Sequence, residues 1–358
     1  MKIAVFMDVE LNRNGVGSYY SDLADFFRKK NFEVDIYNSQ SDIRVLASMK
    51  FPADKTQKIY IPSYGDIKRK FYNSKPDLIF VSFYGPFSSL GVRFAKKLGI
   101  PYIYVVNNDI IKFINHYYGG PLSYTLRKVC LYLERHLINN AEAVVLVNSN
   151  LKHIPDRYTP KTVVTLGTLI DSMFIDRPKP NLVTEINSIL YYGRLAVEKN
   201  IDSIIESAKK IPHLKFNIAG DGPLKSIVEE AANKLDNLKY LGWINRSDII
   251  DTIEKNDMVV MPSIFETFGT VALESLSRGR IVVIGNEHGI REFKILDDCL
   301  FNLEDYNSLE NSIKVISEFN SDEINRISDK SFRCVQEYDS HTKQAWFNLV
   351  NNVNFKHA

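Results

Sequence analysis

Short, mostly apolar runs recur along the chain, and many are followed by residues spaced as on one face of a helix. Such runs are typical of buried strands in a parallel sheet. They cover residues 3–7, 34–37, 76–81, 101–106 and 144–147 in the first half of the chain, and residues 189–192, 216–219, 258–261 and 282–284 in the second. The order strand, helix, strand predicts parallel sheets with helices on both faces.

Helical spacing is clear in residues 19–30 and 87–98, whereas residues 41–75 are less regular. Residues 305–338 indicate two polar helices, and residues 345–350 belong to a final helix. One further helical stripe, which we expect to lie mostly in the core, consists of Leu126, Val129, Leu133 and Leu137.

Prolines interrupt the pattern near the middle of the chain. Pro178, Pro180 and the polar run that ends at Asn187 indicate a connecting segment, so we place a domain boundary at about residues 170–185. A chain of 358 residues is long enough for two α/β domains, each with its own core.

The composition is ordinary for a globular protein, with 45% hydrophobic residues, 25% charged residues and a net charge of +2. We see no apolar run near the roughly 20 residues that span a bilayer and no signal peptide, so we expect a cytoplasmic protein. The three cysteines have no metal-binding or disulfide spacing, and we expect them to be reduced and buried. They are Cys130, Cys299 and Cys334.

Charge is distributed unevenly. Residues 1–165 contain 23 Lys and Arg against 14 Asp and Glu, whereas the remainder contains 22 against 29. Residues 110–138 mix aromatic with basic side chains, so the exposed part of this segment suits an anionic acceptor or an anionic membrane surface. We expect no nucleic-acid partner.

Residues 257–284, DMVVMPSIFETFGTVALESLSRGRIVVI, contain two carboxylates at an informative spacing. The sequence predicts a buried strand, a turn, a helix that begins near Gly269, and a second strand. Glu266 precedes the helix and Glu274 lies within it.

The first backbone N–H groups of that helix have no partner inside the helix. Those of Phe268, Gly269 and Thr270 therefore favour anionic or hydroxyl-rich ligands, and carboxylates beside them can accept hydrogen bonds from sugar hydroxyls. This is the chemistry of a nucleotide-sugar site. The alternative interpretation is a solvated Glu274 and a Glu266 that only caps the helix.

A glycine-containing loop, Asn14-Gly15-Val16-Gly17-Ser18, is expected between the first strand and the helix of residues 19–30. Gly15 and Gly17 would let the backbone approach a ligand near the start of the helix. The loop lacks the third glycine of the dinucleotide-binding fingerprint.

The string FETFGTVALES resembles the Glu-x7-Glu signature of the retaining glycosyltransferases of family 4, which have the GT-B fold. GRLAVEKN at residues 193–200 and GDGP at residues 220–223 resemble further motifs of this family. Weaker similarity covers nearly the whole chain.

The resemblance implies an α/β fold with two Rossmann-like, doubly wound parallel-sheet domains that face a cleft. We assign residues 1–170 to the acceptor-side domain and residues 171–340 to the nucleotide-sugar domain. Residues 341–358 would form a helix that crosses back to the first domain. Asp221 of the GDGP turn is expected to cap a helix, and we infer no metal site.

The resemblance also implies roles for individual residues. Arg194 and Lys199 would neutralise the diphosphate of the donor as it leaves. Glu266 would hold hydroxyls of the donor sugar, and Glu274 would bind the ribose. The other donor contacts are expected from Gly15, Gly17, Ile244, Phe268, Gly269 and Thr270.

The sequence departs from the family pattern at two places. Asn107, Asn108 and Asp109 stand where family members commonly have a histidine, and His288 replaces a glycine. An asparagine can position a ligand but cannot carry a proton at neutral pH. His116 is a further candidate for the missing histidine, with a packing role as the alternative.

The implied activity is metal-independent, retaining transfer of a hexose from a UDP-sugar or GDP-sugar to a hydroxyl of a glycan or lipid-linked acceptor, as in a cell-surface polysaccharide or glycoconjugate pathway. We expect no cofactor besides the donor substrate. Peripheral contact with the anionic inner face of a membrane is a further hypothesis. The alternatives are a sugar-nucleotide epimerase or phosphorylase of the same fold, and a catalytically silent binding subunit of a transferase complex.

Overall fold

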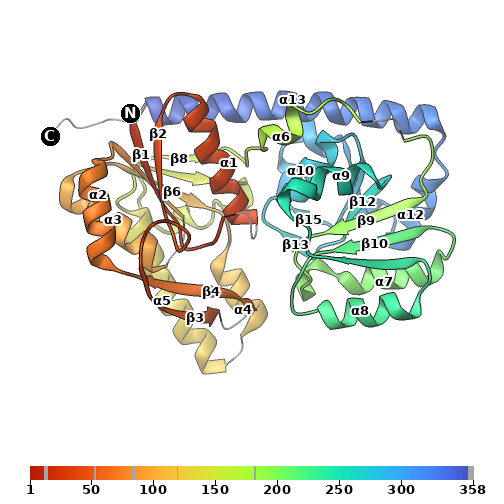
Figure 1. The fold of residues 1–358 in the computed structure, drawn as a ribbon, viewed down its shortest axis with the longest axis horizontal. Helices are drawn as coiled ribbons and strands as arrows, with labels where there is room; N and C mark the ends of the chain where they lie inside the picture. The colour runs from red at the N-terminus through yellow and green to blue at the C-terminus, as the bar shows by residue number, and fades with distance from the viewer. Residues whose placement is uncertain (12–14, 52–53, 83–84, 119, 181–182, 354–358) are drawn as a thin grey trace. The chain divides into compact units, whose positions relative to one another are not determined.

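The computed structural model describes residues 1–11, 15–51, 54–82, 85–118, 120–180 and 183–353. The chain divides into two compact units, of which unit 1 comprises Met1–Leu169 and Thr342–Ala358, and unit 2 comprises Ile170–His341. Each unit contains a parallel sheet packed between helices (Figure 1). The predicted fold class, two Rossmann-like parallel-sheet domains, is confirmed.

Unit 1 is built on a six-stranded sheet with the order β2-β1-β5-β6-β7-β8, in which the described pairings are all parallel. The strands are β1 (Lys2–Phe6), β2 (Glu33–Tyr37), β5 (Leu78–Val81), β6 (Tyr102–Val106), β7 (Ala143–Leu146) and β8 (Val163–Thr165). The three strands β5, β6 and β7 are buried at every position, as expected for strands covered on both faces.

Five α-helices accompany the described part of this sheet. They are α1 (Gly15–Lys29), α2 (Tyr64–Ser74), α3 (Pro86–Leu98), α4 (Ile110–Tyr117) and α5 (Gly120–Ile138), and short 3-10 turns follow at η1 (Ser149–Leu151) and η2 (Pro155–Arg157). Helix α1 begins at Gly15, so the predicted start at residue 19 is wrong. Val16 in the first turn packs partly buried against the core in which Tyr20, Leu23 and Phe27 anchor the helix.

Residues 41–75 are more regular than expected. They form an antiparallel hairpin of β3 (Val45–Phe51) and β4 (Asp54–Pro62), followed by α2. Leu46 and Met49 of the hairpin are 60% and 55% exposed. A ribbon that leaves apolar side chains in solvent lacks the alternation by which a half-buried strand is recognised in a sequence.

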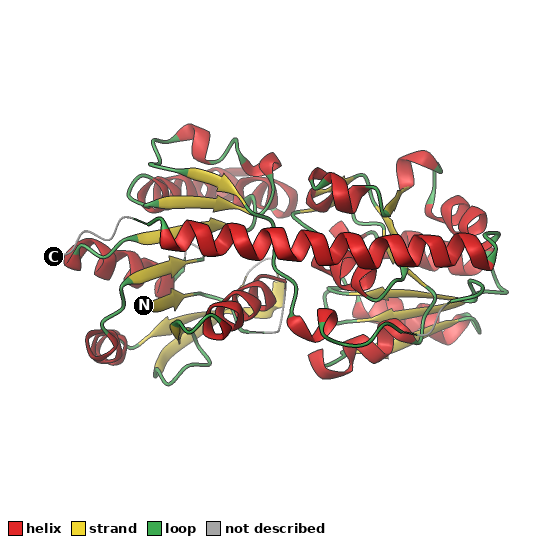
Figure 2. Ribbon diagram, turned by 90° about the horizontal axis from the view of Figure 1, so that it is seen from above, coloured by secondary structure: helices red, strands yellow, loops and turns green. Residues whose placement is uncertain are grey.

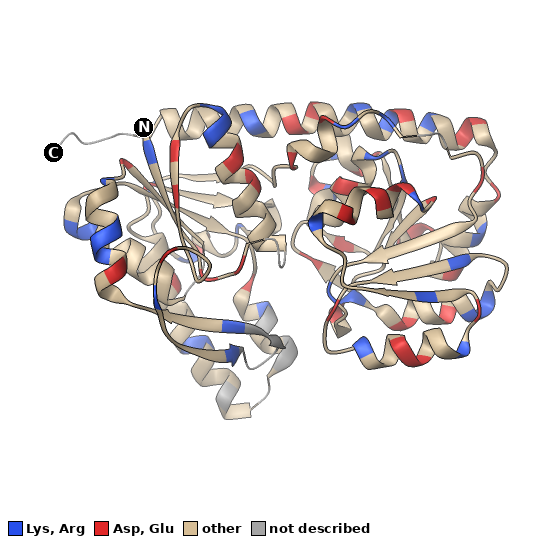
Figure 3. Cartoon of the chain, viewed as in Figure 1, with Lys and Arg blue, Asp and Glu red and all other residues tan. Residues whose placement is uncertain are grey.

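The apolar stripe predicted to lie in the core is only partly buried. Leu137 is 3% exposed, but Val129 is 52% exposed, and Tyr124 and Tyr132 on the same helix are 63% and 73% exposed. Leu126 and Leu133 are half-buried, so within the predicted stripe the expectation is wrong only for Val129. Basic residues accompany these apolar side chains, and Figure 3 marks the lysines and arginines of the unit in blue.

Unit 2 is built on a second six-stranded sheet, with the order β11-β10-β9-β12-β14-β16 and parallel pairings throughout the described residues. The strands are β9 (Ser188–Tyr192), β10 (Lys215–Ala219), β11 (Leu238–Gly242), β12 (Met258–Met261), β14 (Ile281–Ile284) and β16 (Leu300–Asn302). Ile189 and Tyr191 enter one hydrophobic cluster, whereas Leu190 and Tyr192 enter another. Alternate residues of β9 thus fill cores on both faces of the sheet.

The helices of unit 2 are short, and a two-stranded parallel ladder of β13 (Phe265–Glu266) and β15 (Glu287–His288) lies outside its main sheet. The α-helices are α6 (Ser172–Ile175), α7 (Ile201–Lys210), α8 (Lys225–Lys234), α9 (Ile249–Glu254), α10 (Thr270–Ser277), α11 (Lys294–Asp297) and α12 (Leu309–Ser317). The 3-10 turns are η3 (Val197–Lys199), η4 (Arg246–Asp248), η5 (Gly289–Glu292) and η6 (Leu303–Asp305).

The segment expected to connect the domains is folded into unit 2 as far as it is described. Arg278, which is fully buried, donates hydrogen bonds to the carbonyls of Phe174 (3.0 Å) and Pro178 (2.6 Å). The same guanidinium pairs with Glu254 at 2.7 Å. Residues 170–180 are therefore anchored, rather than forming a loose linker.

The C-terminal residues form one long helix, α13 (Ser321–Asn351), instead of the separate polar and final helices that the sequence predicted (Figure 2). Val335 and Tyr338 belong to a hydrophobic cluster of unit 2, whereas Trp346 and Val350 are fully buried in the core of unit 1. The sequence prediction failed because the buried face changes from one unit to the other along the helix.

All three cysteines are free thiols, and Cys299 alone among them is buried.

Within the described residues, no helix is both long enough and apolar enough to cross a bilayer.

Candidate functional site

The loop of residues 193–200 leaves β9 and packs closely against the turn that follows β10. A Cβ atom on Gly220 would lie 1.8 Å from the carbonyl oxygen of Gly193, and one on Gly222 would lie 2.4 Å from that of Leu195. Both glycines have positive φ, 135° and 157°. The GDGP motif thus supports the loop that carries the two predicted cations.

Asp221 of this motif does not cap helix α8, so that prediction is wrong. Its Oδ1 accepts the backbone N–H of Gly222 at 2.9 Å, inside the turn. The N-cap residue of α8 is Leu224. Groups of three or more His, Cys, Asp or Glu side chains that could hold a metal ion are absent from the described part of the chain.

The two predicted cations are both paired with carboxylates. Arg194 Nη1 lies 3.2 Å from Glu198 Oε1, and the ammonium group of Lys199 forms an ion pair with Glu266. The Arg194 and Lys199 side chains remain 23% and 18% exposed. Both side chains are therefore only partly exposed, and Nε and Nη2 of Arg194 are buried.

Glu266 ends β13, a short distance along the chain before helix α10. Gly269 is the N-cap residue, with a φ of 101°, and accepts the N–H of Ala272 at 2.9 Å. Gly269 has no side chain that could cap the helix, and the Glu266 carboxylate accepts a hydrogen bond from the backbone of Thr267, before the helix begins. The first N–H groups of α10 and the Glu266 carboxylate therefore offer complementary donors and acceptors to a hydroxyl-rich ligand.

His288 is a member of this site that the sequence interpretation did not include. It stands opposite Glu266 in the β13–β15 ladder and is 3% exposed. Burial lowers the pKa of His288 to about 4, although Glu266 acts in the opposite sense. Burial alone would raise the pKa of Glu266, but Lys199 and His288 more than offset it and hold that pKa below its ordinary value.

Glu274 is not the solvated helix residue of the alternative interpretation, because it is 6% exposed. Its carboxylate accepts hydrogen bonds from the Tyr192 hydroxyl (3.0 Å) and from Arg246 Nη1 (3.2 Å). Arg246 also lies 3.3 Å from Asp171. Burial raises the pKa of Glu274, while Arg246 and Tyr192 partly offset this shift.

Tyr192 and Arg246 were missed in the sequence because their role depends on a partner far along the chain. Tyr192 ends β9, and Arg246 begins η4, immediately after the loop that contains Ile244. Ile244 packs partly buried against the same hydrophobic cluster as Phe268. Trp243, its neighbour, is 54% exposed.

The remaining donor-binding candidates of unit 2 lie at the start of α10. The Phe268 side chain is 3% exposed and packs against Phe293 and Tyr338, so it belongs to the core and only its backbone could meet a ligand. Thr270 is the first residue of the helix. The structure thus brings together Arg194, Lys199, Glu266, Gly269, Thr270 and Glu274 in one unit.

The candidates of unit 1 lie near the carboxyl edge of its sheet. Gly15 and Gly17 occupy the first turn of α1 instead of the predicted loop. Asn107 follows β6 and donates through Nδ2 to the hydroxyl of Tyr20 on α1 (3.5 Å), and Asn108 is exposed. His116 lies in α4, but its side chain is outside the described residues.

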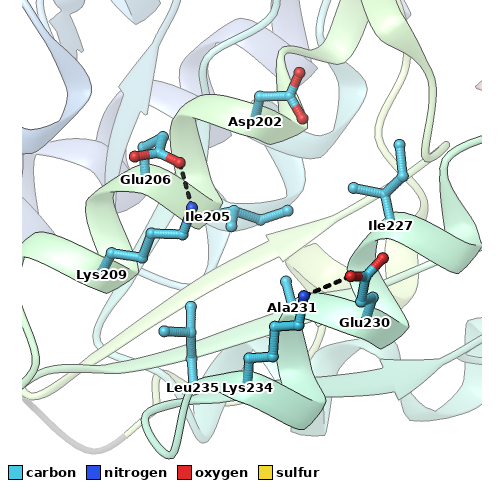
Figure 4. Close-up of a pocket in the computed structure, with 9 residues that line it drawn as sticks. All are labelled: Asp202, Ile205, Glu206, Lys209, Ile227, Glu230, Ala231, Lys234 and Leu235. Carbon is cyan, nitrogen blue, oxygen red and sulfur yellow. Dashed lines mark hydrogen bonds and ion pairs between the residues drawn. The ribbon is translucent and has the colours of Figure 1, made fainter.

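Two surface hollows lie away from these residues. One, of about 290 Å³, runs between α7 and α8 and is lined by Ile205, Ile227 and Leu235 beside the ion pairs Glu206–Lys209 and Glu230–Lys234 (Figure 4). The other, of about 240 Å³, lies beside Tyr132 and His136 of α5. Neither contains a predicted site residue.

Two family models match the chain, Glycosyltransferase Family 4 over residues 13–165 and Glycosyl transferases group 1 over residues 172–330. Among curated proteins, the uncharacterized glycosyltransferase YqgM of Bacillus subtilis is 25% identical over 57% of this chain and 62% of its own length. The alpha-D-kanosaminyltransferase of Streptomyces kanamyceticus is 24% identical over 57% of either protein. The chain thus covers less than two thirds of these relatives.

Solved structures resemble the whole chain. A sucrose-phosphate synthase from Thermosynechococcus elongatus superposes with a TM-score of 0.76 at 16% identity, covering 98% of both chains. Anabaena HepE, in complex with UDP and glucose, superposes with a TM-score of 0.68 at 14% identity, covering 98% of this chain and 99% of its own. At such low sequence identity, these structural similarities support the fold and nothing more.

Proposed function

The chain belongs to the family 4 glycosyltransferases of GT-B fold, and from this premise we propose that it transfers a hexose from a nucleoside diphosphate sugar to a hydroxyl acceptor. The observation that carries the proposal is that two cations lie in the loop after β9, one of them paired with a half-buried carboxylate just before α10, while a second, buried carboxylate lies within α10. These are Arg194, Lys199, Glu266 and Glu274.

The two cations would bind the diphosphate. The Lys199 ammonium has three donors, so it can hold a phosphate oxygen while it still touches Glu266. Arg194 supplies a planar fork suited to phosphate oxygens. Both charges would stabilise the negative charge that grows on the leaving diphosphate, which makes a metal ion unnecessary in this proposal.

The two carboxylates would bind different parts of the donor. Glu266, kept ionised by Lys199, would accept hydrogen bonds from hydroxyls of the hexose. Glu274, fixed by Arg246 and Tyr192, would hold the ribose. The known neighbour HepE was solved with UDP-glucose, which supports a UDP-sugar as the first donor to test.

We propose a retaining reaction. The acceptor hydroxyl attacks the face of the sugar from which the diphosphate departs, and a departing phosphate oxygen takes its proton. The C–O bond to the phosphate breaks as the new C–O bond forms, so no side chain is required as general base. Asn107 and Asn108 could then position ligands without carrying a proton.

A thermal-shift panel of UDP-glucose, UDP-N-acetylglucosamine, GDP-mannose, UDP and GDP tests the proposal. A ligand at a hundredfold excess over its dissociation constant stabilises by about 2.7 kcal/mol. We expect one nucleotide family to stabilise the protein and Glu274→Ala to abolish that effect. Glu229→Ala, on the exposed surface of α8, is the matched control.

The outcomes separate the competing functions. No stabilisation by any nucleotide would contradict the proposed donor site and favour a silent subunit. Conversion of the donor alone into another sugar nucleotide would favour an epimerase. If donor binding is seen, Arg194→Ala should lower turnover by roughly 10²–10³-fold, as loss of one transition-state donor does elsewhere.

We further propose that unit 1 contacts an anionic lipid surface through α5, which would bring a lipid-linked acceptor to the enzyme. Tyr124, Val129 and Tyr132 are exposed there, and Lys128 Nζ lies 5.4 Å from the centre of the Tyr124 ring. Interfacial aromatic rings beside basic side chains favour anionic headgroups.

Co-sedimentation with vesicles of phosphatidylcholine alone or with phosphatidylglycerol tests this contact. We expect binding to the anionic vesicles, reduced by Tyr132→Ser and unchanged by Ile227→Ser, which alters an exposed apolar side chain of unit 2. Equal binding to both kinds of vesicle would refute the proposal.

A further inference from the structure

His288 lies beside Glu266 and the N-cap residue of helix α10. The β13–β15 ladder pairs His288 with Glu266, and Nδ1 of the imidazole lies 3.2 Å from the position that a Cβ on Gly269 would occupy. That same Cβ position lies 3.6 Å from Glu266 Cγ. The ring therefore borders both the carboxylate and the start of α10.

The imidazole is buried, and at least one of its nitrogens has no hydrogen-bond partner in the described part of the chain. It is 3% exposed, and neither Nδ1 nor Nε2 makes a hydrogen bond of good geometry to a described residue. The Met261 carbonyl accepts the backbone N–H of Gly285 at 2.9 Å and also lies close enough to the ring to interact with one of its nitrogens, which leaves the other nitrogen without a partner among the described residues. Buried polar groups without partners are rare and costly, so a retained one indicates a partner that the chain alone does not supply.

The form of the ring determines what that partner can be. With its pKa lowered to about 4, His288 is neutral at pH 7 and offers one donor and one acceptor. A hydroxyl group is likewise both donor and acceptor, so its oxygen can accept the imidazole N–H while its single proton is donated to Glu266.

We infer that His288 is a specificity-determining residue, which recognises a free hydroxyl of the donor hexose together with Glu266. The inference rests on the proposed function. The ring also fills the space that a glycine would leave open at this position. A hexose that carries a bulky acylamino group in place of that hydroxyl is therefore excluded from the site.

Two substitutions separate hydrogen bonding from space filling. His288→Phe keeps a ring of similar size but removes both polar atoms, whereas His288→Asn retains one donor and one acceptor on a shorter side chain. His213→Phe, at an exposed histidine of the same unit, is the matched control. Calorimetric titration measures the dissociation constants of UDP, UDP-glucose and UDP-N-acetylglucosamine, or of GDP and GDP-mannose if the wild type prefers guanosine.

We expect His288→Phe to weaken binding of the sugar nucleotide by about 10- to 100-fold, while binding of the free nucleoside diphosphate stays within about threefold. His288→Asn should retain part of the sugar-dependent affinity and admit the acylamino sugar better than the wild type does. His213→Phe should change neither constant.

Two results would overturn the inference. Equal weakening of the nucleoside diphosphate and the sugar nucleotide would mean that His288 only supports the fold, and unchanged binding of both would mean that it does not meet the sugar. Failure of the wild type to bind any nucleotide would instead contradict the proposed function itself, and the inference would fall with it.

Discussion

Glu266 and Glu274, the two carboxylates of the proposed donor site, have pKa values that shift in opposite directions. Lys199 and His288 outweigh the effect of burial at Glu266, whose pKa is lowered, whereas burial outweighs Arg246 and Tyr192 at Glu274, whose pKa is raised. Two carboxylates with different proton affinities can serve different tasks in one site. Here Glu266 remains the better anion, and so the better acceptor for hydroxyls.

At the scale of single residues, we predict that acid weakens the fold through His288. The unfolded chain binds a proton at this histidine below its ordinary pKa of 6.5, whereas the folded protein does so only near 4. The free energy of unfolding therefore falls as the pH drops from 6.5 to 4, by up to about 3 kcal/mol. The charged groups that face the ring are Glu266, Lys199 and Arg291.

Denaturant unfolding at pH 6.5 and pH 5 measures this loss. His288→Phe should remove about 2 kcal/mol of the pH dependence, whereas His213→Phe should not. Glu266 loses its stabilising charge only below its ordinary pKa of 4.5, outside this interval, and Glu274 is present in every variant. Identical pH dependence in all three proteins would show that His288 is not buried as described.

Some site residues could be predicted from the sequence, and others could not. Glu266 and Glu274 stand in one continuous motif around a helix start, so local spacing is enough to identify them. Arg246 and Tyr192 act through contacts between distant segments, which no local pattern encodes. The unexpected histidine at position 288 was visible, but its burial beside Glu266 was not.

At the scale of elements, strands covered on both faces were the most predictable, because their apolar runs are short and continuous. The β3–β4 hairpin was missed because it exposes apolar side chains, and α13 was divided because its buried face changes along its length. A sequence pattern thus reflects which faces of a helix or strand are buried. Elements whose buried face changes, or whose apolar side chains are exposed, are therefore predicted wrongly.

At the scale of elements, we predict that a substitution in the turn after β10 weakens both stability and ligand binding. Gly220→Ala would place a Cβ 1.8 Å from the Gly193 carbonyl oxygen and push away the loop that carries Arg194 and Lys199. We expect a loss of about 3 kcal/mol in stability, together with at least tenfold weaker binding of the nucleoside diphosphate.

Gly242→Ala is the matched control. Gly242 also has a positive φ, 72°, but a Cβ there meets nothing within 4 Å. It should cost only about 1–2 kcal/mol, the conformational penalty, and leave binding unchanged. Chemical denaturation and calorimetric titration measure both variants, and equal effects on binding would contradict the proposed support of the cation loop.

At the scale of the whole molecule, each unit has its own core, and α13 contributes to both. Trp346 is fully buried in unit 1, where its ring centre lies 5.8 Å from that of Phe80. Trp346→Ala should destabilise unit 1 by about 3–5 kcal/mol. In a calorimetric scan, we expect the unfolding transition of unit 1 to move to lower temperature. The transition of unit 2, which bound nucleotide should shift if the proposed function is right, is expected to stay in place. A single transition that shifts as a whole would show that the two units unfold together.

Unit 1 is assembled from two stretches of chain, and all of unit 2 lies between them in the sequence. On the ribosome, residues 170–341 emerge before Trp346, Val350 and Val353, which complete the core of unit 1. Domains generally fold as units during synthesis. Unit 1 is therefore translated first but completed last, because its core stays open until the final turns of α13 leave the exit tunnel.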